Sequence, residues 1–288
     1  MAQTQDAKHL LDCGGRPLDL ARVAVMGILN VTPDSFSDGG AFNERAKALA
    51  RARAMVEEGA DMIDVGGEST RPNAAPVSVE EEIRRVVPVI EACARELPVP
   101  ISVDTSKPEV MRAAVAAGAG FINDVRALRL PGALAAAAEL GVPVCLMHMQ
   151  GEPATMQIEP RYDDVVADVR RYLAERIEAA VRAGIPRERL IVDPGFGFGK
   201  TVEHNVELLR RLAEFTRLGC PVLAGLSRKS IIGKLRGLSV EQRLYASVAL
   251  ALIAVANGAR IVRVHDVAAT VQAVRMYEAV YPGRAVAR

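Results

Sequence analysis

One pattern recurs along the chain and limits what it can fold into. A short, nearly continuous apolar run is followed by a polar or glycine-rich turn and then by a stretch with helical periodicity. Runs of strand length begin near Val23, Met62, Pro100, Phe121, Val144, Leu190, Val222 and Arg260. Runs such as VAVMGIL and VCLMHM are apolar at almost every position, which is typical of parallel strands covered on both faces. Each gap between runs is long enough for one crossover helix.

This repetition predicts the fold class. No linker, charge block or low-complexity tract divides the 288 residues. Eight strand-helix units without a boundary predict a single (β/α)8 TIM barrel, an α/β fold of about 250 residues. An open doubly wound sheet is the alternative, but a GxGxxG turn would normally follow its first strand, and the sequence has none there. Residues 1–22, with Gly14-Gly15 between two patterned segments, predict an N-terminal hairpin extension, and residues 23–288 the barrel.

Helix ends are also marked in the sequence. Ser78 and Glu81 have the spacing of a capping box at the start of a helix with one apolar stripe. Glycines close helical stretches just before the next strand, where a left-handed C-cap is expected. They are Gly59, Gly118, Gly141, Gly184, Gly219 and Gly258.

Composition excludes several classes of protein. The chain has 36 basic and 35 acidic side chains, so it lacks the basic excess of a nucleic-acid-binding protein. The N-terminus has no apolar core flanked by basic residues, and the apolar run Tyr245–Ala256 is too short to span a bilayer. The four cysteines form no CxxC pair and lie mostly among apolar neighbours. They predict buried free thiols in a reducing cytoplasm, without a zinc site or disulfide framework.

Polar residues cluster where the predicted strands end. In a barrel these carboxyl ends and the loops after them converge on one mouth, where active sites lie. The residues are Asn30, Asp64, Glu68, Ser69, Thr70, Arg71, Asp104, Thr105, Asn123, Asp124, His148, Asp193, Ser227, Arg228, Lys229, Arg263, His265 and Asp266. A single Asp after a strand is most often a helix N-cap, and Asp104 and Asp124 could each be that. Caps alone do not require all eight strands to end this way, so the set predicts a site.

The residue types indicate what the site holds. Asp104, Asn123 and Asp193, after the third, fourth and sixth strands, suit a flat heterocycle whose ring nitrogens and amine need paired hydrogen bonds. Arg263 and His265 lie beside Asn30 in a closed barrel and predict an anion corner, because phosphates usually bind after strands seven and eight. An amide oxygen at Asn30 is a plausible ligand for Mg²⁺ carried on a phosphate.

Two further segments refine this prediction. Ser230 follows Lys229 at the start of a helical stretch, where backbone N–H groups favour a carboxylate or phosphate. The segment DPGFGFGK, Asp193 to Lys200, alternates glycine with Phe196 and Phe198. Such a loop can lay an aromatic ring against a planar ligand, or it can be a turn whose phenylalanines belong to the core.

Taken together, these motifs resemble a known family. NVTPDSFSDGG, DVGGESTRP, SVDTSKP, INDV, MHMQG, DPGFGFGK, GLSRKS and RVHDV follow the order and spacing of bacterial dihydropteroate synthases from about Val23 to His265. The resemblance implies a cytoplasmic transferase of folate biosynthesis, a sulfonamide target and usually a homodimer. It would join 6-hydroxymethyl-7,8-dihydropterin diphosphate to 4-aminobenzoate and release diphosphate, with Mg²⁺ as cofactor and with neither nucleic acid nor membrane as partner.

The matching positions imply roles for individual residues. The pterin would be bound by Asp104, Asn123, Met147, Asp193, Gly225 and Lys229. The diphosphate would be bound by Asn30, which also holds the metal, with Thr70, Arg263 and His265. The aminobenzoate would be bound by Phe36, Thr70, Pro72, Phe198, Lys229 and Ser230. The catalytic residues would be Asp38, Arg71, Lys229, Arg263 and His265.

The resemblance also implies a mechanism and leaves alternatives. Diphosphate would leave first, and the arylamine would capture the pterin-methylene cation under a lid formed by Thr32–Gly40. Asn73 and Ala154 depart from the family pattern, in loops. The alternatives are a methyltetrahydrofolate-binding methyltransferase, a non-catalytic pterin-binding protein, and a Schiff-base aldolase using Lys200.

Overall fold

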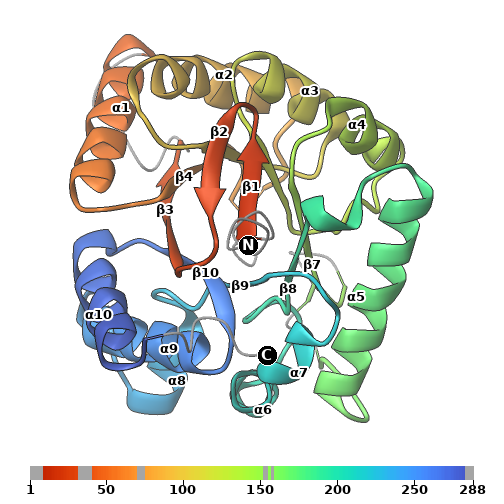
Figure 1. Ribbon diagram of the computed structural model, residues 1–288, viewed down its shortest axis with the longest axis vertical. Coiled ribbons are helices and arrows are strands. Elements are labelled where there is room, and N and C mark those ends of the chain that lie inside the picture. The colour runs from red at the N-terminus through yellow and green to blue at the C-terminus, as the bar shows by residue number, and fades with distance from the viewer. Residues whose placement is uncertain (1–8, 32–40, 70–74, 152–154, 157–158, 283–288) are drawn as a thin grey trace, which may run out of the picture.

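The computed structural model describes residues 9–31, 41–69, 75–151, 155–156 and 159–282. Its centre is a closed barrel of parallel strands in the order β10-β3-β4-β5-β6-β7-β8-β9 (Figure 1). The strands are β3 Ala24–Asn30, β4 Met62–Gly66, β5 Ile101–Asp104, β6 Phe121–Asp124, β7 Val144–Met147, β8 Leu190–Asp193, β9 Val222–Ala224 and β10 Ala259–Val264. Each begins within two residues of its predicted start, and the predicted (β/α)8 barrel is confirmed.

Helices surround the barrel (Figure 1). They are α1 Ala41–Glu57, α2 Val79–Glu96, α3 Pro108–Ala116, α4 Ala133–Leu140, α5 Val165–Arg182, α6 Val202–Arg210, α7 Ala213–Thr216, α8 Ser230–Arg236, α9 Leu244–Ala256 and α10 Val267–Val280, with short 3-10 turns η3 Arg187–Arg189 and η4 Val240–Gln242. Within the part of the chain that the structure describes, no helix combines the length and apolar character needed to cross a membrane.

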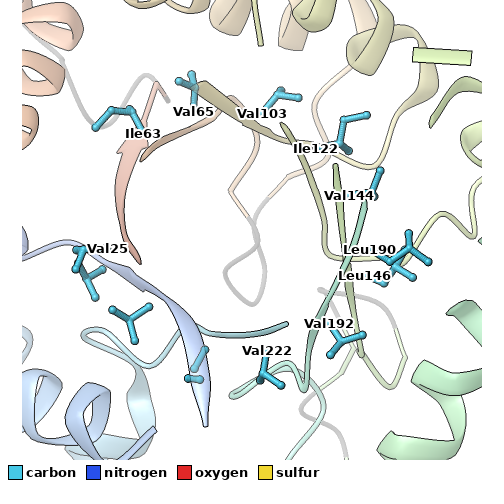
Figure 2. Packing of buried hydrophobic residues seen from close by; sticks show 14 of the residues in the cluster. Val25, Ile63, Val65, Val103, Ile122, Val144, Leu146, Leu190, Val192 and Val222 are labelled. Carbon is cyan, nitrogen blue, oxygen red and sulfur yellow. The ribbon is translucent and has the colours of Figure 1, made fainter. Parts of the chain in front are cut away.

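Alternation along the strands divides the core into an outer and an inner part. Side chains such as Val25, Ile63, Val103 and Ile122 point away from the barrel axis and form one buried cluster with the helices (Figure 2). Their neighbours on each strand point inward, because successive strand residues face opposite sides. This explains why the strands read as continuous apolar runs: both faces are buried.

The lower half of the barrel interior is apolar. Its cluster contains Met26, Met62, Phe121, Cys145, Ile191, Leu223 and Ile261. The same cluster includes Leu11, Cys13, Leu18 and Leu20, which come from the N-terminal hairpin of β1 Leu10–Cys13 and β2 Arg16–Asp19. The hairpin therefore closes the end of the barrel at which the strands begin.

Gly14 and Gly15 make the predicted hairpin turn. Their φ angles are +65° and +83°, which is the left-handed backbone that a two-residue turn between antiparallel strands requires. Close packing holds the hairpin in place, because a Cβ on Gly120, just before β6, would lie 2.0 Å from the carbonyl oxygen of Cys13. A side chain at position 120 would push the hairpin away from the barrel.

Most of the predicted helix ends are confirmed, and one is only half right. All six predicted C-cap glycines have positive φ. Ser78 is the N-cap of α2, and its hydroxyl accepts a hydrogen bond from the backbone N–H of Glu81 at 3.2 Å. The reciprocal half of the capping box is replaced by ion pairs, because the Glu81 carboxylate accepts from Arg84 and Arg85 on the next turn. The four cysteines are buried free thiols, as predicted.

The role of the hairpin as a closure leads to a stability prediction. Leu18→Ala should lower the free energy of unfolding by about 3 kcal/mol, because it opens a cavity in the sealed lower layer. Leu10→Ala, on the same hairpin but with its side chain 54% exposed, is the matched control and should change it little. Urea unfolding followed by circular dichroism measures both. Equal effects of the two substitutions would mean that the hairpin does not seal the core.

Candidate active site

A second, polar layer lies above the apolar one, at the carboxyl ends of the strands. Parallel register pairs Asp64 with Ser102, and Asp104 with Asn123. It also pairs Met147 with Asp193. The inward-pointing residues that lie two positions beyond the apolar layer on each strand therefore meet at the same height in the barrel. A barrel assembles a site from distant segments in this way.

The guanidinium of Arg263 holds this layer together. Its Nε donates to Asp64 Oδ2 at 2.6 Å, and its Nη2 donates to Asp104 Oδ2 at 2.7 Å. Asp64 is fully buried and accepts two more hydrogen bonds, from Ser102 Oγ at 2.5 Å and from Asn123 Nδ2 at 3.0 Å. Four strands are thus joined by one hydrogen-bonded network whose centre is an ion pair.

Charge is unevenly balanced in this network. Burial raises the pKa of Asp104 to about 7; Arg263 opposes the shift, while the neighbouring carboxylates Asp64, Glu82 and Asp124 add to it. Burial alone would lower the pKa of Arg263, but Asp64 and Asp104 outweigh it and hold that pKa above its usual value. The guanidinium therefore stays charged, and burial works against the charge of Asp104.

A second pair of charges faces this network. Asp193 Oδ1 accepts from the backbone N–H of Gly195 at 2.7 Å, and the Lys229 amine donates to the carbonyl oxygen of Phe196. Burial raises the pKa of Asp193, opposed by Lys229. Burial lowers the pKa of Lys229 to about 8, opposed by Asp193. Each group limits the cost of burying the other.

Gly225 leaves room beside the side chains of Arg263 and Lys229. A Cβ at this position would lie 3.8 Å from Arg263 Cβ and 3.9 Å from Lys229 Nζ. A longer side chain at position 225 would crowd the Arg263 side chain and the Lys229 amine. The structure thus brings the six predicted pterin residues, Asp104, Asn123, Met147, Asp193, Gly225 and Lys229, to one end of the barrel.

The two phenylalanines of the DPGFGFGK loop have different surroundings. Phe196 is fully buried in the outer core, so the second alternative, a phenylalanine that belongs to the core, holds for it. Phe198 packs against a small cluster with Val125, Met147 and Met149, and Lys229 Nζ lies 4.8 Å from its ring centroid. Only Phe198 is placed to present a ring to a ligand.

Asn30 and His265 lie at the rim. A Cβ on Gly66 would be 3.8 Å from Asn30 Oδ1 and 3.6 Å from Asp104 Oδ2, so both oxygens approach the end of the same strand. The side chain of His265 contacts Ser227 Oγ through Nδ1 at 3.0 Å. Arg263 is turned toward Asp64 and Asp104, so these two ion pairs belong to the carboxylate layer and not to the rim.

The rim carries a candidate metal ligand, Asn30. Residues 9–31, 41–69, 75–151, 155–156 and 159–282 contain no group of three His, Cys, Asp or Glu side chains that could hold a metal ion. Asn30 offers a single exposed amide oxygen at the end of β3. That donor set suits an Mg²⁺ ion that arrives on a phosphate and keeps most of its other ligands from substrate and water.

The structure separates the two aspartates that could have been caps. Asp124 points outward and accepts from Ser106 Oγ and from the backbone N–H groups of Arg126 and Leu128, so its role is structural. Asp104 points inward, and Lys107 takes the N-cap position of α3 instead. The N-cap hypothesis is wrong for both, because Gly132 is the N-cap of α4; Asp124 accepts instead from backbone N–H groups of the turn that follows β6.

The geometry around Lys200 disfavours the aldolase alternative. Its amine is buried and is surrounded by His148 Nδ1 and by the carbonyl oxygens of Gly195 and Phe198, each at 2.9 Å. A Schiff-base lysine must reach a substrate carbonyl. This amine points into the protein.

Several predicted residues lie outside the described part of the chain. They are Phe36, Asp38, Thr70, Arg71 and Pro72, the departures Asn73 and Ala154, and the lid segment Thr32–Gly40. Their roles stay predictions. Sequence reasoning placed Asp64 at a strand end but gave it no function, and it overlooked Ser102. The signal was the two-residue spacing Met62-Asp64-Gly66, which puts Asp64 on the inward face.

Comparison with known proteins gives a consistent result. The model of the family described as "Pterin binding enzyme" matches residues 26–265. A relative from Escherichia coli (strain K12), named dihydropteroate synthase, is 59% identical over 265 residues, 92% of this chain and 94% of the relative. The dihydropteroate synthase of Haemophilus influenzae is 55% identical over 262 residues, 91% of this chain and 95% of the relative.

Solved structures agree with the sequence relatives. The dihydropteroate synthase of Xanthomonas albilineans with 4-aminobenzoic acid has a TM-score of 0.91 and 59% identity, covering 95% of this chain and 98% of its own. The same enzyme in complex with 7,8-dihydropteroate has a TM-score of 0.87 and 57% identity, covering 95% and 99%. The chain belongs to the pterin binding enzyme family, and within it to the dihydropteroate synthases, which are transferases.

The central position of Asp64 leads to a second stability prediction. Asp64→Ala should lower the free energy of unfolding by about 3 kcal/mol, because it leaves Ser102 and Asn123 without an acceptor and Arg263 with one carboxylate in place of two. Glu139→Ala, which removes an exposed partner of Arg112, is the control and should stay close to wild type. If thermal and urea unfolding show no difference between the two variants, the ion pair is not what holds the layer.

Proposed function

We propose that this chain condenses 6-hydroxymethyl-7,8-dihydropterin diphosphate with 4-aminobenzoate to give 7,8-dihydropteroate and diphosphate, as a step of folate biosynthesis. The observation that carries the proposal is the buried polar layer in which Arg263 joins Asp64 and Asp104 beside Asn123 and Asp193. Acceptors and an amide at this depth match the donors and acceptors along the edge of a pterin ring. The family membership and the ligands named for its relatives support the same reaction.

The pterin ring would lie flat above the apolar layer. Asp193 and Asp104 would accept from its ring nitrogens and exocyclic amine, and Asn123 would complete the set. Met147 would pack on the ring, and Gly225 would leave space for it. Lys229, which lies on the same level, would donate to a ring acceptor.

The aminobenzoate would bind nearer the rim. Phe198 is the ring that the structure exposes toward Lys229, which supports a stacked arylamine. Ser230, the first residue of α8, would meet the carboxylate. Phe36, Thr70 and Pro72 complete the proposed site.

The diphosphate would bind between Asn30, Thr70, Arg263 and His265. Arg263 uses its Nε–H and one Nη2–H for Asp64 and Asp104, which leaves three of its five N–H donors for an anion. It could therefore bind a leaving group without releasing the carboxylates. Asn30 would hold Mg²⁺, which when bound supplies positive charge to the phosphate oxygens.

The proposed chemistry is dissociative. The bond between the pterin methylene carbon and oxygen breaks first, and diphosphate takes the electron pair. The arylamine lone pair then forms the new carbon-nitrogen bond, and the nitrogen loses a proton. Arg263 and His265 would stabilise the departing charge. Asp38, in the loop after β3, would stabilise the developing cation, and Arg71, in the loop after β4, would close over the reactants while both loops exclude water.

Diphosphate release is the direct test of this proposal. Purified protein with dihydropterin diphosphate, 4-aminobenzoate and Mg²⁺ should release one diphosphate for each 7,8-dihydropteroate formed. A coupled diphosphate assay with chromatography of the product measures both. EDTA should suppress turnover and added Mg²⁺ should restore it, whereas full activity in EDTA would contradict the role of Asn30. Absence of product under all conditions would overturn the function.

Two variants test the division of the site within the same assay. Asp193→Ala should abolish binding of the pterin diphosphate in calorimetry. His265→Ala should slow diphosphate release by about 100-fold and leave binding of a pterin without diphosphate nearly intact. Equal losses for both ligands in His265→Ala would contradict the diphosphate role.

We also propose a homodimer that uses the outer face of α9 and α10. The two helices pack side by side (Figure 1). Together they expose the side chains of Tyr245, Ile253, Met276 and Val280. Tyr245 is 84% and Met276 66% exposed, which is unusual for large apolar side chains on neighbouring helices. A second copy would cover this face.

The four buried free thiols support a reducing, cytoplasmic location.

Sedimentation velocity tests the dimer. The wild-type chain should sediment as twice its 30.8 kDa mass. Met276→Glu should shift it to the monomer, because a carboxylate would be buried in the interface. Val181→Glu, at an exposed apolar residue on α5, is the control and should remain dimeric. A wild-type monomer at micromolar concentration would overturn this proposal.

A further inference from the structure

The loop from Asp193 to Lys200 carries two groups that surround Lys229. The carbonyl oxygen of Phe196 accepts from the Lys229 amine, and the ring of Phe198 lies beside that amine. The loop itself has little intrinsic stiffness, because Gly195, Gly197 and Gly199 all have positive φ. Something other than backbone preference must fix the position of both groups.

Lys200 supplies the missing constraint. Its amine lies 2.9 Å from each of three acceptors: the Gly195 carbonyl, the Phe198 carbonyl and His148 Nδ1. A lysine ammonium has three N–H donors, so the set is complete. The residue is only 2% exposed, so its amine has little access to solvent.

The charge state of His148 fits this arrangement. Burial, and next to it the charge of Lys200, lowers the pKa of His148 to about 2, so the imidazole is neutral and Nδ1 can accept a hydrogen bond. Burial also lowers the pKa of Lys200 well below its usual value, with Asp193 opposing the shift and Lys229 adding to it. Burying this amine is costly, and its hydrogen bonds to the loop and to His148, the residue after β7, offset that cost.

Two other side chains hold the same loop. The Tyr162 hydroxyl donates to the Gly199 carbonyl at 2.8 Å, and Asn205 Oδ1 accepts from the backbone N–H of Gly197 at 2.6 Å. The carbonyls of residues 195, 196, 198 and 199 therefore each have a side-chain donor. Among these donors, Lys200 is the one that ties the loop to the neighbouring strand through His148.

We propose that Lys200, paired with His148, is a positioning residue for the aminobenzoate half of the reaction; this rests on the proposed function. It fixes the position of the loop. The Phe196 carbonyl can then hold the Lys229 amine, and the Phe198 ring can pack against the arylamine. Of the residues proposed for the pterin, Asp104, Asn123 and Asp193 are placed by the strands β5, β6 and β8. Lys229, which contacts the loop, belongs to both halves of the site, whereas Phe198 lies on the loop itself. Loss of Lys200 should therefore affect the second substrate much more than the pterin.

Lys200→Met tests the proposal, because methionine keeps the unbranched chain, one atom shorter, and removes the donors. The KM for 4-aminobenzoate should rise about tenfold, as expected for loss of positioning hydrogen bonds. The dissociation constant of the pterin diphosphate, measured by calorimetry, should stay within about threefold of wild type. Lys234→Met, at an exposed lysine on α8, is the matched control and should change neither value.

A milder variant guards against misfolding. Tyr162→Phe removes only the hydroxyl that donates to Gly199, and it should raise the same KM by about threefold without altering the pterin dissociation constant. An unchanged KM in folded Lys200→Met, or in Tyr162→Phe if Lys200→Met does not fold, overturns the proposal. Equal losses for both substrates also overturn it. Wild-type turnover, measured alongside, separates these outcomes from failure of the proposed function.

Discussion

The site depends on a single guanidinium shared by two buried carboxylates. Arg263 on β10 reaches Asp64 on β4 and Asp104 on β5, so the charge that makes burial of the aspartates tolerable comes from across the barrel. Two negative groups compete for one positive group. Burial raises the pKa of Asp104 and the charge of Asp64 adds to this shift, while the two carboxylates together keep Arg263 charged.

The barrel interior has two layers: an apolar layer that stabilises the fold and, nearer the carboxyl ends of the strands, a polar layer that forms the candidate site. Met62, Phe121 and Ile191 fill the lower layer with the hairpin beneath them, and two residues further along the same strands Asp64, Asn123 and Asp193 form the polar layer. The period of two along a strand makes this division possible. Apolar packing below holds the strands at the spacing that the hydrogen bonds above require.

The fold could be predicted from sequence because its signals are local. Apolar runs, helical stripes and glycine C-caps each lie within a short segment, and each strand start was predicted to within two residues. The site was predicted less completely. Asp104 and Asp124 look alike in sequence, and only the phase of each strand turns one inward and the other outward. The pairing of Arg263 with Asp64 joins residues far apart in the chain, so it depends on barrel closure.

The hairpin also bears on how the polar layer can be reached. Leu11, Leu18 and Leu20 cover the end of the barrel where the strands begin, and Met62, Phe121 and Ile191 fill the interior above them. A ligand of the polar layer would therefore enter from the carboxyl ends of the strands, where the loops that vary between barrel enzymes lie. The element that seals one end thus assigns all access to the other.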